Sequence, residues 1–457
     1  MKIIILGAGQ VGSSVAANLA SEANDITVVD VDITLLRDLQ ERLDIRTVHG
    51  QGSHPDVLKR AGAEDADMIL AVTNSDETNM LACQIAQHLF RTPTKIARVR
   101  SREYLQYPHL FGPDAIPVDF MLSPEQMVID YMERLIDHPG ALQVLDFADG
   151  LVQLVAVKAY YGGLLVGQQL RKLRDHMPNV DTRVAAIFRK GTPIIPEGET
   201  VIEADDEVFF IAARKDIRKV IGELRRLDKP NKRIIIAGGG NIGKGLAMAL
   251  EKSYQVKLID HNLRNSCQIS EQLERTIVLH GDAADEELLL EENITSTDVF
   301  CAVTNDDESN ILSAMLAKRL GARKVMALIN RASYVNLVES GDIDIAISPH
   351  QAMIGSLLAH VRRGDVAVVH SLRHGAAEAM EAVAHGDKHS SRVVGRTVEE
   401  IKLPPGANIG AIVRGDEVVI AHHDTVIEAE DHVILFLVDK RRVREVEKLF
   451  QVRVTFL

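Results

Sequence analysis

The chain of 457 residues is longer than one ordinary folding unit, and its 46% apolar and 26% charged residues are typical of folded globular proteins. The formal net charge of −13 disfavours binding to the phosphate backbone of nucleic acids. No apolar run reaches the roughly 18 to 20 residues of a membrane span, and three cysteines without a CxxC pair argue against a disulfide framework or a zinc cluster. We therefore expect a cytoplasmic protein with several domains.

The first 140 residues alternate short apolar segments with longer helical ones. The apolar segments occupy residues 2–6, 26–30, 45–48, 68–72 and 95–99. They barely alternate with polar residues, so both faces of each strand are expected to be buried, as in a parallel sheet between helices. Ser123, Pro124 and Gln126 are typical of the start of a closing helix. Residues 1–140 are predicted to form a Rossmann-like, doubly wound α/β domain.

A GxGxxG loop, Gly7-Ala8-Gly9-Gln10-Val11-Gly12, stands between the first strand and a helix expected over Ser13–Ala20. In this context the first glycine allows a tight turn, the second lets the backbone approach a pyrophosphate, and the third lets the helix pack closely on the strand. The free N–H groups and the dipole at the start of the helix favour bound phosphate. This part of the motif therefore predicts a dinucleotide-type site.

An acidic residue at the end of the second strand, Asp30, is the next element of such a site. Its carboxylate would accept hydrogen bonds from the adenosine ribose and repel a 2′-phosphate, which favours NAD(H) over NADP(H). ATP carries the same adenosine, ribose and pyrophosphate, so the motif does not separate ATP from NAD(H).

Further polar side chains follow neighbouring strands. Thr73 and Asn74 end the fourth strand, where the distal phosphate or the second ribose would pass. Arg98, on the fifth strand, would be able to clamp a phosphate with two hydrogen bonds. The alternative for the Thr-Asn pair is structural, with Ser75 or Asp76 capping the next helix.

Residues 141–227 are too few for another such sheet. Their clustered Val, Ile and Leu segments, with a terminal helix after Asp216, predict a small α+β domain. A proline and polar residues in Leu227–Lys232 interrupt the apolar pattern and mark the end of the first half.

The second half repeats the first. Three segments return at one displacement of 231 residues, which carries Gly7 to Gly238: Lys2–Gly12 as Arg233–Gly243, Val48–Gly50 as Leu279–Gly281, and Ala71–Asn79 as Ala302–Asn310. The second set of candidate binding residues is Gly238, Gly240, Asn241, Ile242, Gly243, Asp260, Thr304 and Asn305, with Asp306 or Asp307 as alternative helix caps. We expect a second Rossmann-like domain at 232–364, closed by a helix after Ser348-Pro349, and a second α+β domain at 365–457 with its own terminal helix after Asp439.

These motifs resemble the RCK (KTN) family of domains, regulators of potassium conductance, and the doubled layout extends the resemblance over essentially the whole chain. The resemblance implies that the glycine loop, the second-strand acid, an acidic residue after the third strand and the Thr-Asn segment surround a nucleotide. It adds Asp282 in the second half. The first half has Gln51 at that position, where Gln51 or Ser53 would have to substitute. Because Arg98 also corresponds to Leu328, we expect two unlike sites.

The resemblance further implies the ligands and the partner. NAD(H), or ATP or ADP at one of the two sites, would bind and change the shape of a homo-oligomeric ring, a tetramer for a chain with two units. That ring would lie beneath an integral-membrane potassium transporter and gate it. The chain would then be attached peripherally to the inner face of the membrane.

Two other functions compete with this one. An NAD-dependent oxidoreductase would need a general acid or base near the nicotinamide, but the tails are short, repeated and without an evident His/Asp or Tyr/Lys pair, so no catalytic residue is predicted. A nucleotide-binding regulator of a partner that does not move potassium fits the motifs equally well. His385, His389, His422 and His423 complete no four-ligand set, so no metal site is predicted. Cys83 and Cys301 are expected in the core.

Overall fold

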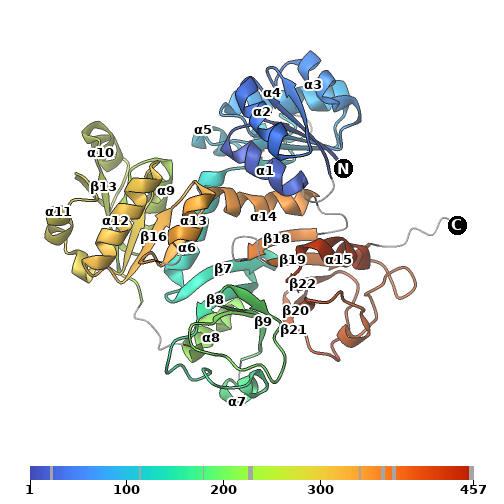
Figure 1. The fold of residues 1–457 in the computed structure, drawn as a ribbon, viewed down its shortest axis with the longest axis vertical. Coiled ribbons are helices and arrows are strands. Elements are labelled where there is room, and N and C mark those ends of the chain that lie inside the picture. Colours follow the sequence, from blue (N-terminus) through green and yellow to red (C-terminus); the bar gives the residue numbers. More distant parts are fainter. Residues whose placement is uncertain are drawn as a thin grey trace. The chain divides into compact units, whose positions relative to one another are not determined.

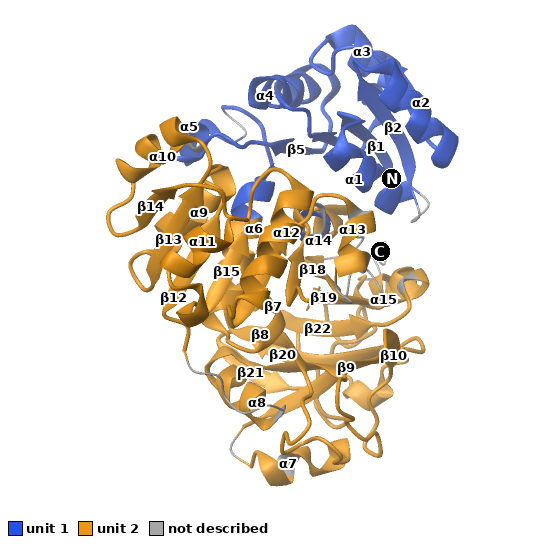
Figure 2. Cartoon of the chain, turned by 60° about the vertical axis from the view of Figure 1, so that its left-hand side comes forward, with its two compact units in different colours: residues 1–127, 352–354 blue, residues 128–351, 355–457 orange. Residues whose placement is uncertain are grey.

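A computed structural model describes residues 1–20, 24–112, 115–178, 180–224, 230–338, 341–361, 366–372 and 377–451. Two compact units make up the chain (Figure 2): unit 1 comprises residues 1–127 and 352–354, and unit 2 comprises residues 128–351 and 355–457. The predicted domain limits at 227 and at 364 and 365 lie outside the described residues.

Unit 1 contains a parallel sheet in the order β3-β2-β1-β4-β5-β6, with six strands among the described residues. Figure 1 draws this sheet in shades of blue. The strands are β1 (Lys2–Leu6), β2 (Asp25–Asp30), β3 (Arg46–His49), β4 (Met68–Ala71), β5 (Thr94–Arg98) and β6 (Phe120–Leu122). The helices between them are α1 (Gln10–Ala20), α2 (Ile33–Arg42), α3 (Pro55–Ala61), α4 (Asp76–Ile85) and α5 (Arg102–Leu105). The apolar side chains of β1 and β4 are buried on both faces, as expected for central strands of a doubly wound sheet.

Unit 2 contains a second parallel sheet with the equivalent order β14-β13-β12-β15-β16-β17. Its strands are β12 (Arg233–Ala237), β13 (Gln255–Asp260), β14 (Ile277–His280), β15 (Val299–Ala302), β16 (Lys324–Leu328) and β17 (Ile345–Ile347). Its helices are α9 (Asn241–Leu250), α10 (Leu263–Ser270), α11 (Glu286–Glu291), α12 (Asp307–Arg319) and α13 (Ala332–Val338). The predicted pair of Rossmann-like sheets is confirmed.

The strands of the first half agree with the predicted segments to within one residue at each end, but two expectations were wrong. The sixth strand of each sheet was not predicted, since β6 and β17 have three residues and no hydrophobic period can be recognised over so short a span. The first helix begins at Gln10 and not at Ser13, because the third glycine of the loop lies inside its first turn. The closing helices α6 (Pro124–Asp137) and α14 (Pro349–Val361) begin at the predicted prolines.

Each half also carries an antiparallel sheet, in the orders β7-β8-β11-β9-β10 and β18-β19-β22-β20-β21. The first comprises β7 (Ala141–Phe147), β8 (Val152–Lys158), β9 (Thr182–Arg189), β10 (Thr192–Ile194) and β11 (Glu207–Ala213), with α7 (Leu173–His176) and α8 (Ile217–Leu224). The second comprises β18 (Val366–Leu372), β19 (Ala377–Ala384), β20 (Ala407–Arg414), β21 (Glu417–Ile420) and β22 (Asp431–Leu437), with α15 (Val443–Phe450). The predicted α+β character and the terminal helices are confirmed.

The same ion pair fixes a turn in both antiparallel sheets. The guanidinium of Arg189 donates two hydrogen bonds of 2.8 and 2.9 Å to Asp206, whose side chain is fully buried. Arg414 does the same to Asp431, at 2.8 Å in both bonds. Such paired, two-bond geometry is what lets a carboxylate remain charged inside a core.

The two antiparallel sheets pack on each other within unit 2. Their shared core contains Phe147, Phe188, Phe209 and Phe436, which are nearly inaccessible. Equivalent strands also exchange polar contacts, because Arg183 donates to the carbonyls of Ile409 and Ala421 at 3.2 and 2.6 Å and Asn408 donates to that of Ala185 at 3.2 Å. The repeat thus builds an internal pair of like sheets.

Helix α6 contacts the second parallel sheet although it follows the first in sequence. Its apolar residues belong to one core with β12, β13 and β16. Asn231 donates to the carbonyl of Ile136 at 2.7 Å, and Lys324 donates to that of Leu135 at 3.4 Å. Nothing in the local pattern of α6 distinguishes which sheet it would cover.

His370 lies in the junction between the two antiparallel sheets and gives unit 2 an expected pH dependence. Its Nε2 is 2.8 Å from the carbonyl oxygen of Asp146, its ring packs edge-on against Phe147 at 4.9 Å, and burial lowers its pKa to about 4. Since the unfolded chain binds this proton near pH 6.5 and the folded chain does not, stability should fall between pH 6.5 and 4, by up to about 3 kcal/mol.

Urea unfolding followed by circular dichroism between pH 4 and 7 measures this effect. A His370→Gln variant should lose that part of the pH dependence, whereas His423→Gln, at an exposed histidine of the same region, should keep it. Equal pH profiles for His370→Gln and the unaltered protein would exclude the proposed origin.

Candidate nucleotide sites

Both glycine loops lie at the carboxyl ends of the parallel strands, where ligands of doubly wound sheets bind. The N–H of Gly7 donates to the carbonyl of Val29 at 2.8 Å, and that of Gly238 donates to Ile259 at 2.8 Å. These two glycines have φ values of 108° and 109°, which L-residues rarely adopt. The first glycine of each loop is therefore fixed by backbone geometry.

The second and third glycines of each loop differ in the space available for a side chain. A Cβ on Gly12 would stand 1.8 Å from the carbonyl oxygen of Gly7, and one on Gly243 would stand 1.8 Å from that of Gly238. A Cβ on Gly9 or Gly240 would meet nothing within 4 Å. The third glycine is thus required for packing, and the second leaves the backbone open on the side that a pyrophosphate would approach.

The acids of the second strands lie against their own glycine loops. The Asp30 carboxylate accepts hydrogen bonds from the N–H of Ala8 at 2.5 Å and of Asp32 at 2.8 Å. The Asp260 carboxylate accepts from Gly239 at 2.7 Å and from Asn262 at 2.8 Å. Because a carboxylate has about four acceptor positions, each acid retains capacity for ribose hydroxyl groups.

The second site holds its acid more tightly than the first. Asn265 donates to Asp260 at 3.1 Å and to the carbonyl of Gly239 at 3.2 Å, and Asp260 is only 7% exposed. At the position of Asn265 the first half has Leu35, which is 38% exposed. The two acids therefore differ in hydration as well as in neighbours.

The threonine of each Thr-Asn segment is hydrogen-bonded to a buried asparagine that was not predicted as part of the site. The hydroxyl of Thr73 donates to the side-chain oxygen of Asn79 at 2.7 Å, and the Asn79 amide donates to the carbonyls of Thr73 and Arg98 at 3.3 and 2.9 Å. Thr304 and Asn310 repeat this contact at 2.6 Å. Both asparagines are fully buried. Their presence at the same position in both repeated segments was the feature of the sequence that could have identified them.

The capping alternative is confirmed in part. Ser75 accepts from the N–H of Thr78 at 3.1 Å and Asp306 from that of Ser309 at 2.7 Å, so these two residues cap α4 and α12. Asp76 and Asp307 do not cap these helices. Asp76 accepts from Arg100 and Ser101, and Asp307 from Asn330 and Arg331, all through backbone N–H groups of the segment after β5 or β16.

Arg98 and Leu328 occupy the same position, since the carbonyl of each accepts the amide of the buried asparagine at 2.9 Å. The Arg98 guanidinium lies 3.3 Å from Glu125, with its side chain 17% exposed, so its charge already has a partner. Leu328 is 4% exposed and apolar. At this position the first site therefore has an ion pair and the second has a buried apolar side chain.

The other predicted residues lie around the same edge. Gln10 and Asn241 are exposed in the first turns of α1 and α9, and Val11 is buried there. Gln51 is half-buried and its carbonyl accepts the N–H of His54 at 3.0 Å, whereas Asp282 is exposed and accepts the N–H of Ala284 at 2.9 Å. The side chains of Asn74 and Asn305 are exposed beside Thr73 and Thr304. Ala8, Gly9, Ile242 and Gly240 complete the two loops.

A histidine at the end of the third strand supports each site and was also missed. The Nε2 atoms of His49 and His280 lie 3.0 and 3.1 Å from the carbonyl oxygens of Val31 and His261, the residues directly after the two acids. The repeated Val-His-Gly and Leu-His-Gly segments carried this signal in the sequence.

Other candidate chemistry is limited in the described part of the chain. No group of three His, Cys, Asp or Glu side chains there has a metal-binding arrangement, and His385 instead pairs with Glu430 at 2.7 Å. Cys83 and Cys301 are buried, as predicted, and burial raises the pKa of both thiols to about 12. No helix of the described residues has the length and apolar character needed to cross a membrane.

Comparison with known protein families places both halves in two recurring types of domain. The family model of the TrkA-N domain matches residues 3–117 and 234–349, and that of the TrkA-C domain matches residues 154–225 and 388–451. Curated relatives named "Trk system potassium uptake protein TrkA" are 66% identical in Halomonas elongata, over 456 residues, and 63% identical in Vibrio alginolyticus, over 458 residues. Both alignments cover 100% of this chain and of the relative.

Solved structures show the same fold at low sequence identity. The chain matches the GsuK channel with a TM-score of 0.63 and 19% identity, covering 98% of this chain and 78% of that one. It matches the crystal structure of the GsuK RCK domain with a TM-score of 0.61 and 19% identity, covering 98% and 94%. A further structure of that channel, bound to NAD, gives a TM-score of 0.61 at 18% identity, covering 98% and 78%.

Proposed function

The chain belongs to the TrkA family of Trk potassium-uptake proteins, and from this membership we propose that it is a nucleotide-binding regulatory subunit that gates a membrane potassium transporter. In this proposal NAD(H) binds at one or both glycine loops, ATP or ADP is a candidate at one of them, and the chain catalyses no reaction.

The open second glycine beside a second-strand acid, present in both halves, is the observation that carries this proposal. The bare backbone at Gly9 and Gly240 leaves room for a pyrophosphate at the N-terminus of α1 or α9. Asp30 and Asp260 stand where the adenosine ribose would lie, and their charge disfavours the 2′-phosphate of NADP(H). The unlike neighbours Arg98 and Leu328, and Gln51 and Asp282, support different ligand preferences for the two sites.

The domain arrangement follows the duplication. We propose nucleotide-binding domains at 1–140 and 232–364, and small C-terminal domains at 141–227 and 365–457. Self-association into a homotetrameric ring would place these domains below a Trk-type transporter subunit, with the chain peripherally attached to the cytoplasmic face of the membrane. A closed ring is the usual assembly of identical chains with repeated surfaces.

Substitution of the two acids tests the nucleotide sites. Asp30→Asn and Asp260→Asn should each weaken NADH or ATP binding at the altered site about tenfold or more, since a hydrogen bond to a charged group contributes about 1.5 to 3 kcal/mol. Isothermal titration of both ligands against the full chain measures this. Asp32→Asn is the matched control, because it introduces the asparagine that the second half carries at Asn262 and that caps a helix equally well.

Three outcomes would contradict the proposal. Unchanged affinities in both acid variants would remove the proposed sites. Steady hydride transfer from NADH to a small carbonyl compound by the purified protein would favour an oxidoreductase. Unchanged potassium uptake at low external potassium in cells that lack the gene would point to a partner that does not carry potassium.

A further inference from the structure

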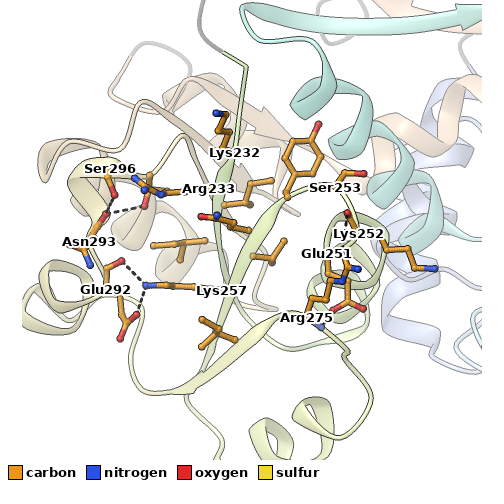
Figure 3. A pocket seen from close by; sticks show the side chains of 17 residues that line it. Lys232, Arg233, Glu251, Lys252, Ser253, Lys257, Arg275, Glu292, Asn293 and Ser296 are labelled. Atoms are coloured by element: carbon orange, nitrogen blue, oxygen red, sulfur yellow. Dashed lines mark hydrogen bonds and ion pairs between the residues drawn. The ribbon is translucent and has the colours of Figure 1, made fainter.

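The second parallel sheet has a pocket at the edge opposite its glycine loop. Figure 3 shows the side chains that line this pocket. Its lining residues begin β12, β13 and β14 or stand in the turns after α9 and before β15. Gly238, Asp260 and Thr304 lie at the other ends of these strands, so the pocket is separate from the nucleotide site. Its volume is about 970 Å³, and small-molecule sites typically have about 300 to 1,000 Å³.

The charge of the pocket is mainly positive although the chain as a whole is acidic. Five cationic side chains line it, namely Lys232, Arg233, Lys252, Lys257 and Arg275, against the two carboxylates of Glu251 and Glu292. Among the described residues no acidic partner is found for Lys232, Arg233, Lys252 or Arg275. Four cations are thus available to a ligand.

Both carboxylates of the pocket are already engaged by the protein. Glu292 binds the ammonium group of Lys257 at 2.6 Å. Glu251 accepts from the N–H groups of Arg275 and Thr276 at 2.9 and 3.1 Å and from the Thr276 hydroxyl at 3.0 Å. Glu292 is therefore neutralised by Lys257. Glu251 keeps its charge, but the protein already occupies its acceptor positions, so among the described residues the pocket has four unpaired cations against one carboxylate.

The equivalent edge of the first half has the opposite charge. The positions of Gln255, Arg275 and Ser296 are occupied by Asp25, Asp44 and Asp65 in the repeat. Lys2, the counterpart of Arg233, is paired with Asp65. A cationic pocket is therefore not a by-product of the repeated fold but a property of the second half alone.

We propose that this pocket binds a small phosphorylated molecule as a ligand distinct from the nucleotide of the glycine loop. The cations would hold its phosphate groups, and Ile277, which is 55% exposed, offers an apolar surface to the rest of the molecule. Tyr254, which also lines the pocket, donates a 2.5 Å hydrogen bond to Asp137 at the end of α6. Ligand binding would thereby act on the helix that leads into the first antiparallel sheet.

Equilibrium dialysis of the full chain with radiolabelled inorganic pyrophosphate, at about 0.15 M salt to suppress diffuse binding, tests this site. Arg233→Ala/Arg275→Ala should weaken the binding of one pyrophosphate per chain about tenfold or more. Lys2→Ala/Arg46→Ala removes the same charge from the first half and should bind as the unaltered chain does. The unaltered chain and both double variants keep the two glycine loops. Pyrophosphate bound at these loops is therefore the same in all three and does not contribute to the difference in binding between them.

Further outcomes decide whether pyrophosphate binds in this pocket and whether its natural ligand is a small molecule or a lipid headgroup. Equal binding by both double variants and the unaltered chain, or no binding by the unaltered chain at millimolar pyrophosphate, would overturn the proposal. If the unaltered chain co-sedimented with phosphatidylglycerol vesicles and the Arg233→Ala/Arg275→Ala variant did not, the proposal would be overturned in favour of a lipid headgroup as the ligand. Thermal unfolding verifies that the variants are folded, and Lys252→Glu at an exposed position provides a second variant with the same expected loss.

Discussion

Gly12→Ala is expected to destabilise unit 1 by more than about 4 kcal/mol, and Gly243→Ala should have the same effect on the second parallel sheet. The new methyl group would stand 1.8 Å from the carbonyl oxygen of Gly7 or Gly238, and both neighbours are backbone atoms that no side-chain rotation can move. Helix α1 or α9 would have to separate from its strand. The expected result is therefore loss of folding and not a weakened site.

Gly9→Ala is the matched variant one turn earlier, with a different expected result. Its methyl group meets nothing within 4 Å, so stability should stay within about 0.5 kcal/mol of the unaltered chain. Under the proposed function the methyl group would occupy the space of the pyrophosphate and weaken NADH binding. Thermal unfolding and titration separate the two effects. A Gly12→Ala protein that unfolds at the original temperature would show that the close packing is wrong.

Asn79→Ala and Asn310→Ala are expected to cost about 2 to 4 kcal/mol each, the second largest effect. Each asparagine is fully buried and satisfies a backbone N–H and a carbonyl at the ends of two neighbouring strands. Alanine would leave these groups without a partner in a place that water does not reach. The threonine hydroxyl at the end of β4 or β15 would also lose its acceptor.

Asn305→Ala provides the control for this prediction, since its side chain is exposed beside the same segment. Its free energy of unfolding in urea should match that of the unaltered chain, whereas Asn310→Ala should unfold at clearly lower urea. If the two variants unfolded at the same concentration, the buried asparagine would not be the anchor of the strand ends.

Much of the fold followed from the sequence because its signals are local and repeated. Uninterrupted apolar segments such as Lys2–Leu6 and Arg233–Ala237 predicted central strands, and the displacement of 231 residues between equivalent motifs predicted two equivalent sheets. Serine and proline at 123 and 124 placed the start of α6 at the correct residue. An element as short as β6 has too few residues to show a hydrophobic period, so it was not predicted.

The glycine loops and the acids at the ends of the second strands could also be predicted from the sequence, because their roles depend on backbone conformation and on the order of strand, loop and helix. The sequence could identify Gly12 as a close-packed glycine and Asp30 as the acid at the end of β2. The identity of the bound nucleotide and the four domain limits stay predictions.

Tertiary structure alone decided which partner each polar side chain takes. Arg98 faces Glu125, 27 residues away, and Thr73 gives its hydroxyl hydrogen to Asn79, and no local pattern predicted either partner. Helix α6 covers the second sheet through contacts with Asn231 and Lys324. The cationic pocket likewise joins the starts of three strands. Sequence periodicity records which face of an element is apolar, but contacts between distant segments depend on how the chain packs, and these fix the available charges and hydrogen-bonding groups.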